Sequence, residues 1–285
     1  MIYAQVVVDG IIVGLVFALV AMGLSLIYGV MNIVNFAHGE FMMIAMYLCF
    51  FMAVGLGLDP LASAPIVALA MFAFGVLVYR LVARHLLEAS MIAQMFATFG
   101  MLLFFQALVN FLWKADTRSV PDNWSTGNFS VAGLFFNTPE LVASLGALAT
   151  AIVLFWFINR TETGLALQAA AEDPQVARLL GVNTDRMYAL TWGLSAATVG
   201  VAGALLSTFL PVYPLVGTNW ALPAFVAVAI GGFGSITGAF WGGIIVGLVQ
   251  TVGGFATSPN YKLLFVYGLY LLIVLLRPHG LMGKR

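Results

Sequence analysis

The hydrophobic positions of the chain fall into long apolar runs separated by short polar segments. A helix needs about 20 mostly apolar residues to cross the hydrocarbon core of a bilayer. Runs of about that length predict membrane-spanning helices at residues 5–28, 33–57, 60–82, 91–113, 140–158, 187–210, 234–255 and 262–276. A further run, 221–230, is too short for an ordinary crossing and indicates a half-helix, a re-entrant segment or a crossing completed by its neighbours. The pattern predicts an all-α polytopic bundle of about eight transmembrane helices, with one broken or re-entrant helix, in a single domain covering residues 1–285.

Composition agrees with lipid as the solvent. The chain has 285 residues, of which 62% are hydrophobic and 8% charged, whereas soluble domains carry roughly 25% charged residues. The formal net charge of zero gives no indication of a nucleic-acid partner. The single cysteine, Cys49, has no partner for an intrachain disulfide and is expected to be a small buried hydrophobe. The N-terminus lacks a basic n-region, so the first apolar run is expected to be retained as a span.

The distribution of Lys and Arg predicts the orientation, because cytoplasmic loops carry an excess of these residues. A cytoplasmic C-terminus, with Lys284 and Arg285, groups most of the basic residues on one side and leaves only Lys114, Arg118 and Lys262 outside. We therefore expect an external N-terminus and a cytoplasmic C-terminus. Loop 114–138 would be external, either as a wet loop with interfacial aromatic residues or as a docking surface for an external protein.

The second long loop, residues 160–186, would be cytoplasmic and carries signals for two short helices. Asp173 followed by Pro174 is typical of a helix start, and Gly181 of a helix end. Val176, Leu179 and their neighbour Leu180 give the second helix an apolar stripe. Such a helix could lie on the bilayer, pack on the protein's own spans, or insert into a groove of a cytoplasmic partner.

A polar segment interrupts the apolar sequence near the N-terminus. Asn32, Asn35, His38 and Glu40 fall within nine residues. If the first span ends near Tyr28 at the cytoplasmic side, Asn35 or His38 can cap the second helix, and Glu40 lies in its first turn. His38 and Glu40 are two residues apart and would face different directions on a helix, which disfavours one shared proton site. The segment is either an interfacial cap or a helix break that lines a path or supports its inner gate.

A glycine-rich segment follows the short apolar run. Gly231, Gly232, Gly234 and Ser235 separate that run from a full span. Glycines there could serve helix packing, or could free the backbone to turn at membrane depth, which is tolerated only inside protein or beside water. Small residues at Gly238, Gly242 and Gly243 have the spacing that permits close helix packing.

Several kinds of chemistry are absent from the sequence. It contains no GxxxxGK[ST] phosphate loop and no HExxH or GxSxG motif, so neither ATP hydrolysis by that route nor intramembrane proteolysis is expected. Intramembrane carboxylates are scarce, with Glu40 as the main candidate, which indicates that energy for any transport comes from elsewhere. An ion-coupled secondary transporter that uses Glu40, or a passive channel for a small neutral solute, stays open as an alternative.

Three segments, "YGVMNIVNFAHGEFMMIAMY", "AAAEDPQVARLLGVNTDR" and "GGFGSITGAFWGG", occur in this order. Together they resemble the permease subunits of branched-chain amino acid ABC importers, the LivH-type family, and the resemblance covers nearly the whole chain. It implies a subunit of the bacterial cytoplasmic membrane that forms half of a heterodimeric pore with a related second permease. Two cytoplasmic ATPases would hold ATP and Mg²⁺, an external binding protein would deliver the substrate, and this chain itself would need no cofactor.

The resemblance also implies roles for individual residues. The 160–186 loop is similar to a coupling loop that docks on the ATPase, through Ala171, Glu172, Asp173, Arg178, Leu179, Gly181 and Asn183. The candidates for the translocation path or gate are Asn32, Asn35, His38, Gly39, Glu40, Gly231, Gly232, Gly234 and Ser235. The implied substrate is a branched-chain or other apolar amino acid, with urea, amides or another small solute as alternatives.

Overall fold

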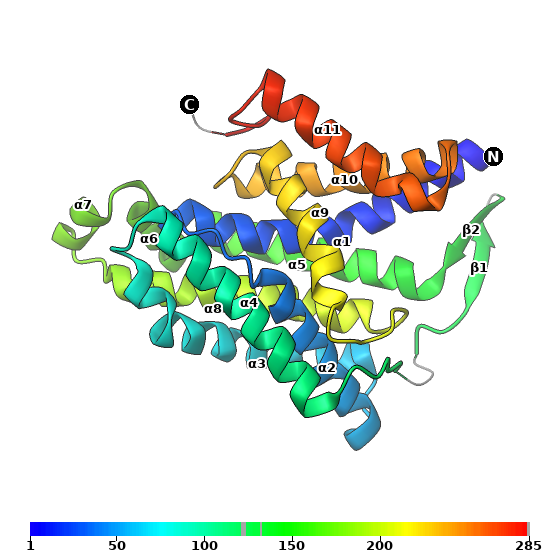
Figure 1. Ribbon diagram of the computed structural model, residues 1–285, viewed down its shortest axis with the longest axis horizontal. Coiled ribbons are helices and arrows are strands. Elements are labelled where there is room, and N and C mark those ends of the chain that lie inside the picture. The colour runs from blue at the N-terminus through cyan, green and yellow to red at the C-terminus, as the bar shows by residue number, and fades with distance from the viewer. Residues whose placement is uncertain (121–123, 132, 284–285) are drawn as a thin grey trace.

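The computed structural model describes residues 1–120, 124–131 and 133–283 of the chain (Figure 1). In this part of the chain, eight helices are long and apolar enough to cross a membrane, which confirms the predicted all-α polytopic class. These are α1 Ile2–Met31, α2 His38–Leu56, α3 Pro60–Leu81, α4 Met91–Trp113, α5 Thr138–Arg160, α8 Thr184–Leu206, α10 Ile236–Ala256 and, as one span Pro259–Leu276, α11 Lys262–Leu276 with the short turn before it. The shorter elements are η1 Ala83–Leu86, β1 Asn128–Val131, β2 Leu134–Asn137, α6 Glu162–Glu172, α7 Pro174–Leu179, α9 Val216–Gly231 and η2 Pro259–Tyr261.

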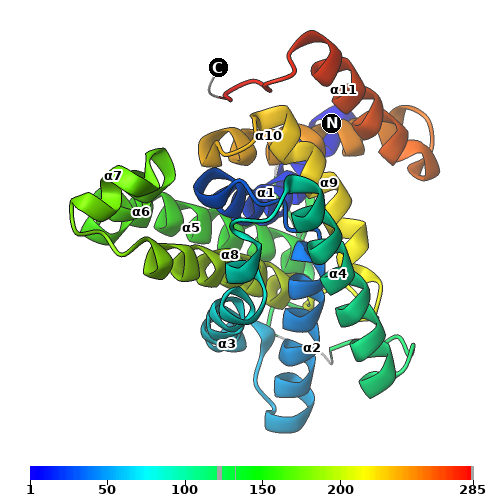
Figure 2. The ribbon, with the colours of Figure 1, turned by 60° about the vertical axis from the view of Figure 1, so that its left-hand side comes forward.

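Helix α1 forms the centre of the bundle. In its most apolar stretch of 18 residues, 83% of the stretch is buried inside the protein. The corresponding share is 22% for α4 and 6% for the span that contains α11, and both helices lie at the periphery (Figure 2). Small residues allow α1 and α10 to approach backbone to backbone: a Cβ added to Gly14 would lie 2.9 Å from Ile244 Cα, and one added to Gly10 would lie 3.0 Å from Leu248 Cα. Close approach of this kind stabilises helix pairs through van der Waals contact, because lipid supplies no hydrophobic force between helices.

The packing role expected for the small residues of α10 is present. Gly243 faces Ala18 of α1, and Gly242 faces the backbone of Ala227 in α9. The complementary surface on α1 was not predicted, although Gly10, Gly14 and Ala18 recur at intervals of four residues.

The two chain termini lie at opposite ends of the bundle, which we call the hairpin face and the tail face (Figure 1). At the hairpin face, the Gln5 side chain donates to Phe135 O (2.7 Å) and accepts from Phe135 N (2.8 Å). At the tail face, Leu281 N donates to Ile230 O at the end of α9. Helices α6 and α7 lie at the tail face as well (Figure 1).

The short apolar run adds to the eight predicted spans. Residues 207–231 pass from the hairpin face to the tail face: Val212 pairs with Arg118 at the hairpin-face end, and Ile230 meets the tail. The short apolar run at 221–230 is the C-terminal part of α9, a helix of 16 residues.

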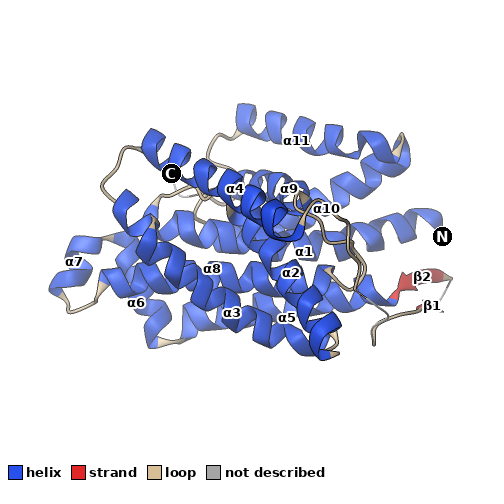
Figure 3. Cartoon of the chain, turned by 60° about the horizontal axis from the view of Figure 1, so that its bottom comes forward, coloured by secondary structure: helices blue, strands red, loops and turns tan. Residues whose placement is uncertain are grey.

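The loop at the hairpin face contains secondary structure that the sequence analysis did not predict. Strands β1 and β2 form an antiparallel hairpin with Asn128 opposite Asn137, and it lies beside the N-terminus (Figure 3). Phe129 and Phe136 stack across the hairpin, with ring centroids 5.4 Å apart. Residues 121–123 and 132 of this loop, and the tail residues Lys284 and Arg285 used in the charge argument, lie outside the described residues.

Candidate functional site

The polar segment after α1 is a helix break. Asn32 ends α1 in a left-handed conformation (φ 54°), and α2 begins six residues later at His38. The Asn35 side-chain oxygen accepts a hydrogen bond from Ala37 N (3.1 Å), so it organises the turn that leads into α2. The capping prediction was wrong in its detail, because the N-cap position belongs to Ala37 and no side chain caps the helix.

The break also lies deeper than predicted. Ring nitrogen Nε2 of His38 is 2.9 Å from Val20 O, which is about 16 Å before the end of α1 at the usual helical rise. Asn35, His38 and Glu40 are all at most 1% exposed. Residues 32–37, which end in a turn at 36–37, return alongside α1 and bring the start of α2 into the interior. The His38 side chain therefore reaches into the interior of the bundle.

Glu40 is a junction of three helices. Its Oε1 accepts from Gln106 Nε2 of α4 (2.9 Å) and from Thr218 Oγ1 of α9 (3.4 Å), and Gln106 also donates to Thr218 (3.0 Å). Within the described residues, Glu40 Oε2 is buried without a partner. His38 and Glu40 contact different helices, as their spacing predicted. Gln106 and Thr218 were missed, although polar residues inside apolar runs are themselves a functional signal.

Gly39, between these two residues, lies where α2 crosses α9. A Cβ on Gly39 would lie 2.5 Å from Gly217 O and 2.6 Å from Ala221 Cβ. Neither a carbonyl oxygen nor a buried alanine in a helix can move away without shifting a backbone. Gly39 therefore allows α2 and α9 to cross closely. It contributes to the Glu40 hydrogen-bond network through this packing and presents no side chain to it.

The predicted break between the short run and α10 is present at Gly232 and Gly234. Both have positive φ (104° and 80°), which side chains other than glycine rarely adopt. Ser235 begins the next helix, because its Oγ accepts from Gly238 N (3.0 Å). Gly231 packs against the backbone of Gly238, so the residues on the two sides of the break are in contact.

The C-terminal tail is fastened to this break. Leu281 N and Met282 N donate to the carbonyls of Ile230 (2.8 Å) and Gly231 (2.9 Å) at the end of α9. Gly280 has φ 75°, and a Cβ added there would lie 2.5 Å from Gly232 N. These bonds satisfy carbonyl groups that a helix end otherwise leaves unpaired.

Replacing Gly280 by valine should detach the tail from α9, because a β-branched residue is strained at this φ and would collide with Gly232. We expect amide hydrogen exchange at Leu281 and Met282 to accelerate at least tenfold. Leu281→Ala keeps the backbone bonds and serves as the control with unchanged protection. Unaltered exchange in Gly280→Val would show that the glycine does not hold the tail.

The two short helices predicted in the 160–186 loop are α6 and α7. Asp173 caps α7, with Oδ1 accepting from Gln175 N (2.8 Å) and Val176 N (3.0 Å), and Gly181 has φ 88° after its end. Leu179 and Leu180 are 88% and 77% exposed. The apolar stripe of α7 is thus turned away from the protein's own spans.

Two other coupling candidates hold the loop onto α8. Arg178 Nε donates to Thr184 Oγ1 (2.7 Å), and Asn183 caps α8 by accepting from Arg186 N (3.0 Å). The first bond ties α7 to the start of α8, and the second organises the start of α8 itself.

A pocket of about 480 Å³ at the tail face brings three groups of candidates together. Asn32 contributes from the first break, Gly234 and Ser235 from the second, and Ala171 and Glu172 from the end of α6. Met282 of the tail lines the same pocket. Segments that are far apart in the sequence therefore meet at one point, where both helix breaks and the base of the 160–186 loop line the same pocket.

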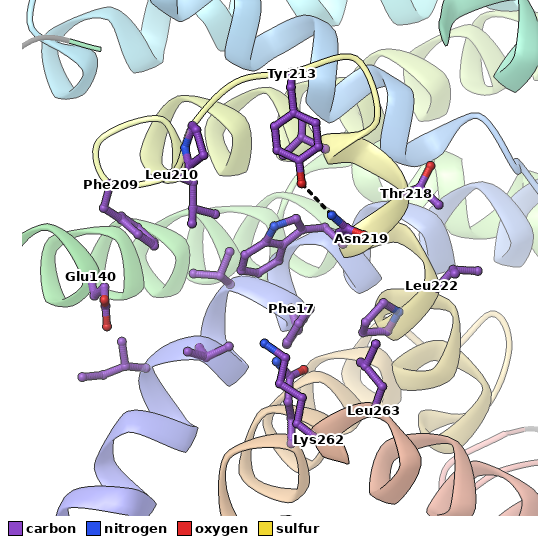
Figure 4. Close-up of a pocket in the computed structure, with 18 of the residues that line it drawn as sticks. Phe17, Glu140, Phe209, Leu210, Tyr213, Thr218, Asn219, Leu222, Lys262 and Leu263 are labelled. Atoms are coloured by element: carbon purple, nitrogen blue, oxygen red, sulfur yellow. Dashed lines mark hydrogen bonds between the residues drawn. The ribbon is translucent and has the colours of Figure 1, made fainter. Parts of the chain in front are cut away.

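A second cavity, of about 580 Å³, opens in the half of the bundle nearer the hairpin face (Figure 4). It lies between α1, α9, α10 and α11, and it was not predicted from the sequence. Thr218 connects this cavity to the Glu40 hydrogen-bond network, since it lines the cavity and also donates to Glu40.

The fold and these sites define a membrane permease: a polytopic bundle with buried polar helix breaks, an interior cavity and a helical loop that contacts both breaks. The family described as "Branched-chain amino acid transport system / permease component" matches residues 6–275. The chain therefore belongs to this family, and it is a multi-pass inner-membrane protein that acts as a permease subunit in branched-chain amino acid transport.

Individual relatives agree with this assignment. The high-affinity branched-chain amino acid transport system permease protein BraD of Pseudomonas aeruginosa is 32% identical over 99% of this chain and 96% of its own length. The permease protein LivH of Escherichia coli K12 has the same identity and coverage. A solved structure, PsaBC from Streptococcus pneumoniae in complex with Fab, shows a weaker likeness, with 13% identity, a TM-score of 0.47 and coverage of 93% of this chain and 90% of that one.

Proposed function

We propose that this chain forms one half of the pore of an ATP-driven importer and pairs with a related second permease. The hairpin face would be external and receive a branched-chain or other apolar amino acid from a binding protein. The tail face would be cytoplasmic. The pocket lined by Asn32, Ser235 and Glu172 supports this most directly. It places both helix breaks beside the loop that would contact the ATPase subunits.

The energy would come from two cytoplasmic ATPase subunits that hold ATP and Mg²⁺, so this chain needs neither a cofactor nor an ATPase site of its own. The exposed leucines of α7 would fill a groove on the ATPase. Closure of the ATPase pair would move α6 and α7, and α8 would follow because Arg178 and Asn183 tie the loop to it.

Reconstitution tests the proposal directly. Proteoliposomes that contain the complete importer should accumulate labelled L-leucine only when ATP and the loaded binding protein are supplied on the correct sides. An ion gradient alone should drive no uptake. Uptake driven by the gradient without ATP would instead support a secondary transporter that uses Glu40.

Replacing Leu179 by aspartate should reduce ATP-driven leucine uptake at least tenfold, because a charge would enter an apolar docking contact. ATP hydrolysis stimulated by the loaded binding protein should fall in parallel, while the amount of protein in the membrane stays unchanged. Thr163→Asp, which adds the same charge at an exposed polar position of α6, is the matched control. Equal uptake in the two variants would remove α7 from the docking surface.

A further inference from the structure

The cavity near the hairpin face has two chemically different walls. Helices α1 and α9 supply an apolar wall, where the rings of Phe17 and Trp220 pack with centroids 4.7 Å apart and Val16 and Leu222 extend the surface. Helices α10 and α11 supply a wall with polar groups, Gln250 and Lys262. Figure 4 shows Lys262 reaching up into the cavity below Phe17, with Glu140 apart from it at another edge.

The polar wall offers one positive group and one free acceptor. Lys262 is the first residue of α11, and that helix has no side-chain cap, so its N-terminal amides add to the positive field of the ammonium group. Gln250 Oε1 is buried and, within the described residues, has no hydrogen-bond partner. A buried carbonyl oxygen of this kind costs free energy unless a donor reaches it.

Two other polar side chains at the cavity already make hydrogen bonds. Asn219 Nδ2 donates to Tyr213 Oη (2.7 Å), and Glu140 Oε1 accepts from Asn137 Nδ2 (2.9 Å). The volume of about 580 Å³ lies within the range of about 300–1,000 Å³ that is usual for small-molecule sites. The cavity is thus suited to a small solute with a charged end and an apolar end.

We propose that this cavity binds an α-amino acid with an apolar side chain on its way into the pore. The carboxylate would face Lys262 and the start of α11, and the ammonium group would lie beside the polar side chain of Gln250. The apolar side chain would lie against Phe17 and Trp220. This inference rests on the proposed function. It adds a specific binding site in this chain, where the substrate is held after the external protein has released it.

Direct binding tests the proposal. The complete importer, purified in lipid nanodiscs without the external binding protein, is titrated with radiolabelled L-leucine, and glycine serves as the competitor that lacks an apolar side chain. We expect saturable leucine binding that glycine displaces at least tenfold less effectively than unlabelled leucine. No saturable binding, or equal competition by glycine, would overturn the proposal.

Variants place the bound leucine in this cavity. Leu263→Trp fills the cavity from α11, while Leu264→Trp makes the same change at the next residue, which does not line it and is 66% exposed. We expect at least a tenfold loss of affinity in the first variant and none in the second. Lys262→Met, at an exposed position, should weaken binding to a similar extent without affecting folding. Equal affinity in all three variants would place the leucine elsewhere and overturn the proposal.

ATP-driven uptake by the same preparation separates this inference from the proposed function. Uptake of leucine without measurable binding to the permease would leave the importer assignment intact and refute the cavity. Failure of uptake in the wild-type importer, with binding present and sensitive to Leu263→Trp, would refute the transport assignment and retain the cavity as a leucine site.

Discussion

Replacing Gly39 by alanine should remove most of the folded protein from the membrane. The added methyl group would lie 2.5 Å from Gly217 O and 2.6 Å from Ala221 Cβ, where α2 crosses α9. Neither neighbour is the flexible end of a side chain, so the two helices must separate, at a cost near the upper end of the usual overpacking range, about 3 kcal/mol. The yield of detergent-stable protein and its apparent Tm would measure the effect.

Gly55→Ala is the matched control, because it makes the same change in the same helix. A Cβ at Gly55 meets nothing within 4 Å. Alanine is favoured over glycine in a helix by roughly 0.5–1 kcal/mol, so this variant should be neutral or slightly more stable. If both variants were equally stable, the close approach of α2 and α9 would not be needed for folding.

Glu40→Ala should reduce leucine uptake at least tenfold. The substitution removes the acceptor shared by Gln106 and Thr218 and disconnects α2 from α4 and α9 in the interior of the bundle. Losing a buried hydrogen bond to a carboxyl group costs about 1–3 kcal/mol, and here one acceptor serves two helices. Uptake in proteoliposomes measures the change, and Glu88→Ala, at an exposed position outside the spans, is the control for loss of a carboxyl group.

Glu40→Gln separates hydrogen bonding from charge at this junction. The glutamine oxygen can still accept from Gln106 and Thr218, so this variant should keep more than half of the wild-type uptake. A loss as large as that of Glu40→Ala would mean that the site requires the carboxyl group itself. Full uptake after alanine replacement of Asn35, His38 and Glu40 in turn would remove the segment from the transport mechanism.

Local signals predicted the elements of the fold well. The eight long helices and the two short helices of the 160–186 loop follow from apolar run lengths and from capping residues such as Asp173 and Gly181, which act within a few neighbouring positions. A break at Gly232 and Gly234 was one of the two roles predicted for these glycines, and their positive φ angles agree with it.

Depth and pairing could not be predicted from local signals. Whether α2 begins at a face or in the interior depends on whether the residues before it fold back along α1, which here brings His38 as far as Val20. The partners of Glu40 come from two other helices, and the sequence contains no information on which polar residues of separate spans meet. The hairpin β1–β2, which was not predicted, likewise depends on a distant residue, because Gln5 near the N-terminus bonds to the backbone of its second strand.

The central position of α1 has a consequence for how the protein is made. This helix is synthesised long before α10, yet the backbones that cover Gly10 and Gly14 belong to α10. Between the two events the glycine surface of α1 must be covered by lipid or by an assembly factor. Nascent chains arrested before residue 236 should therefore present an uncovered glycine surface to membrane quality-control proteases.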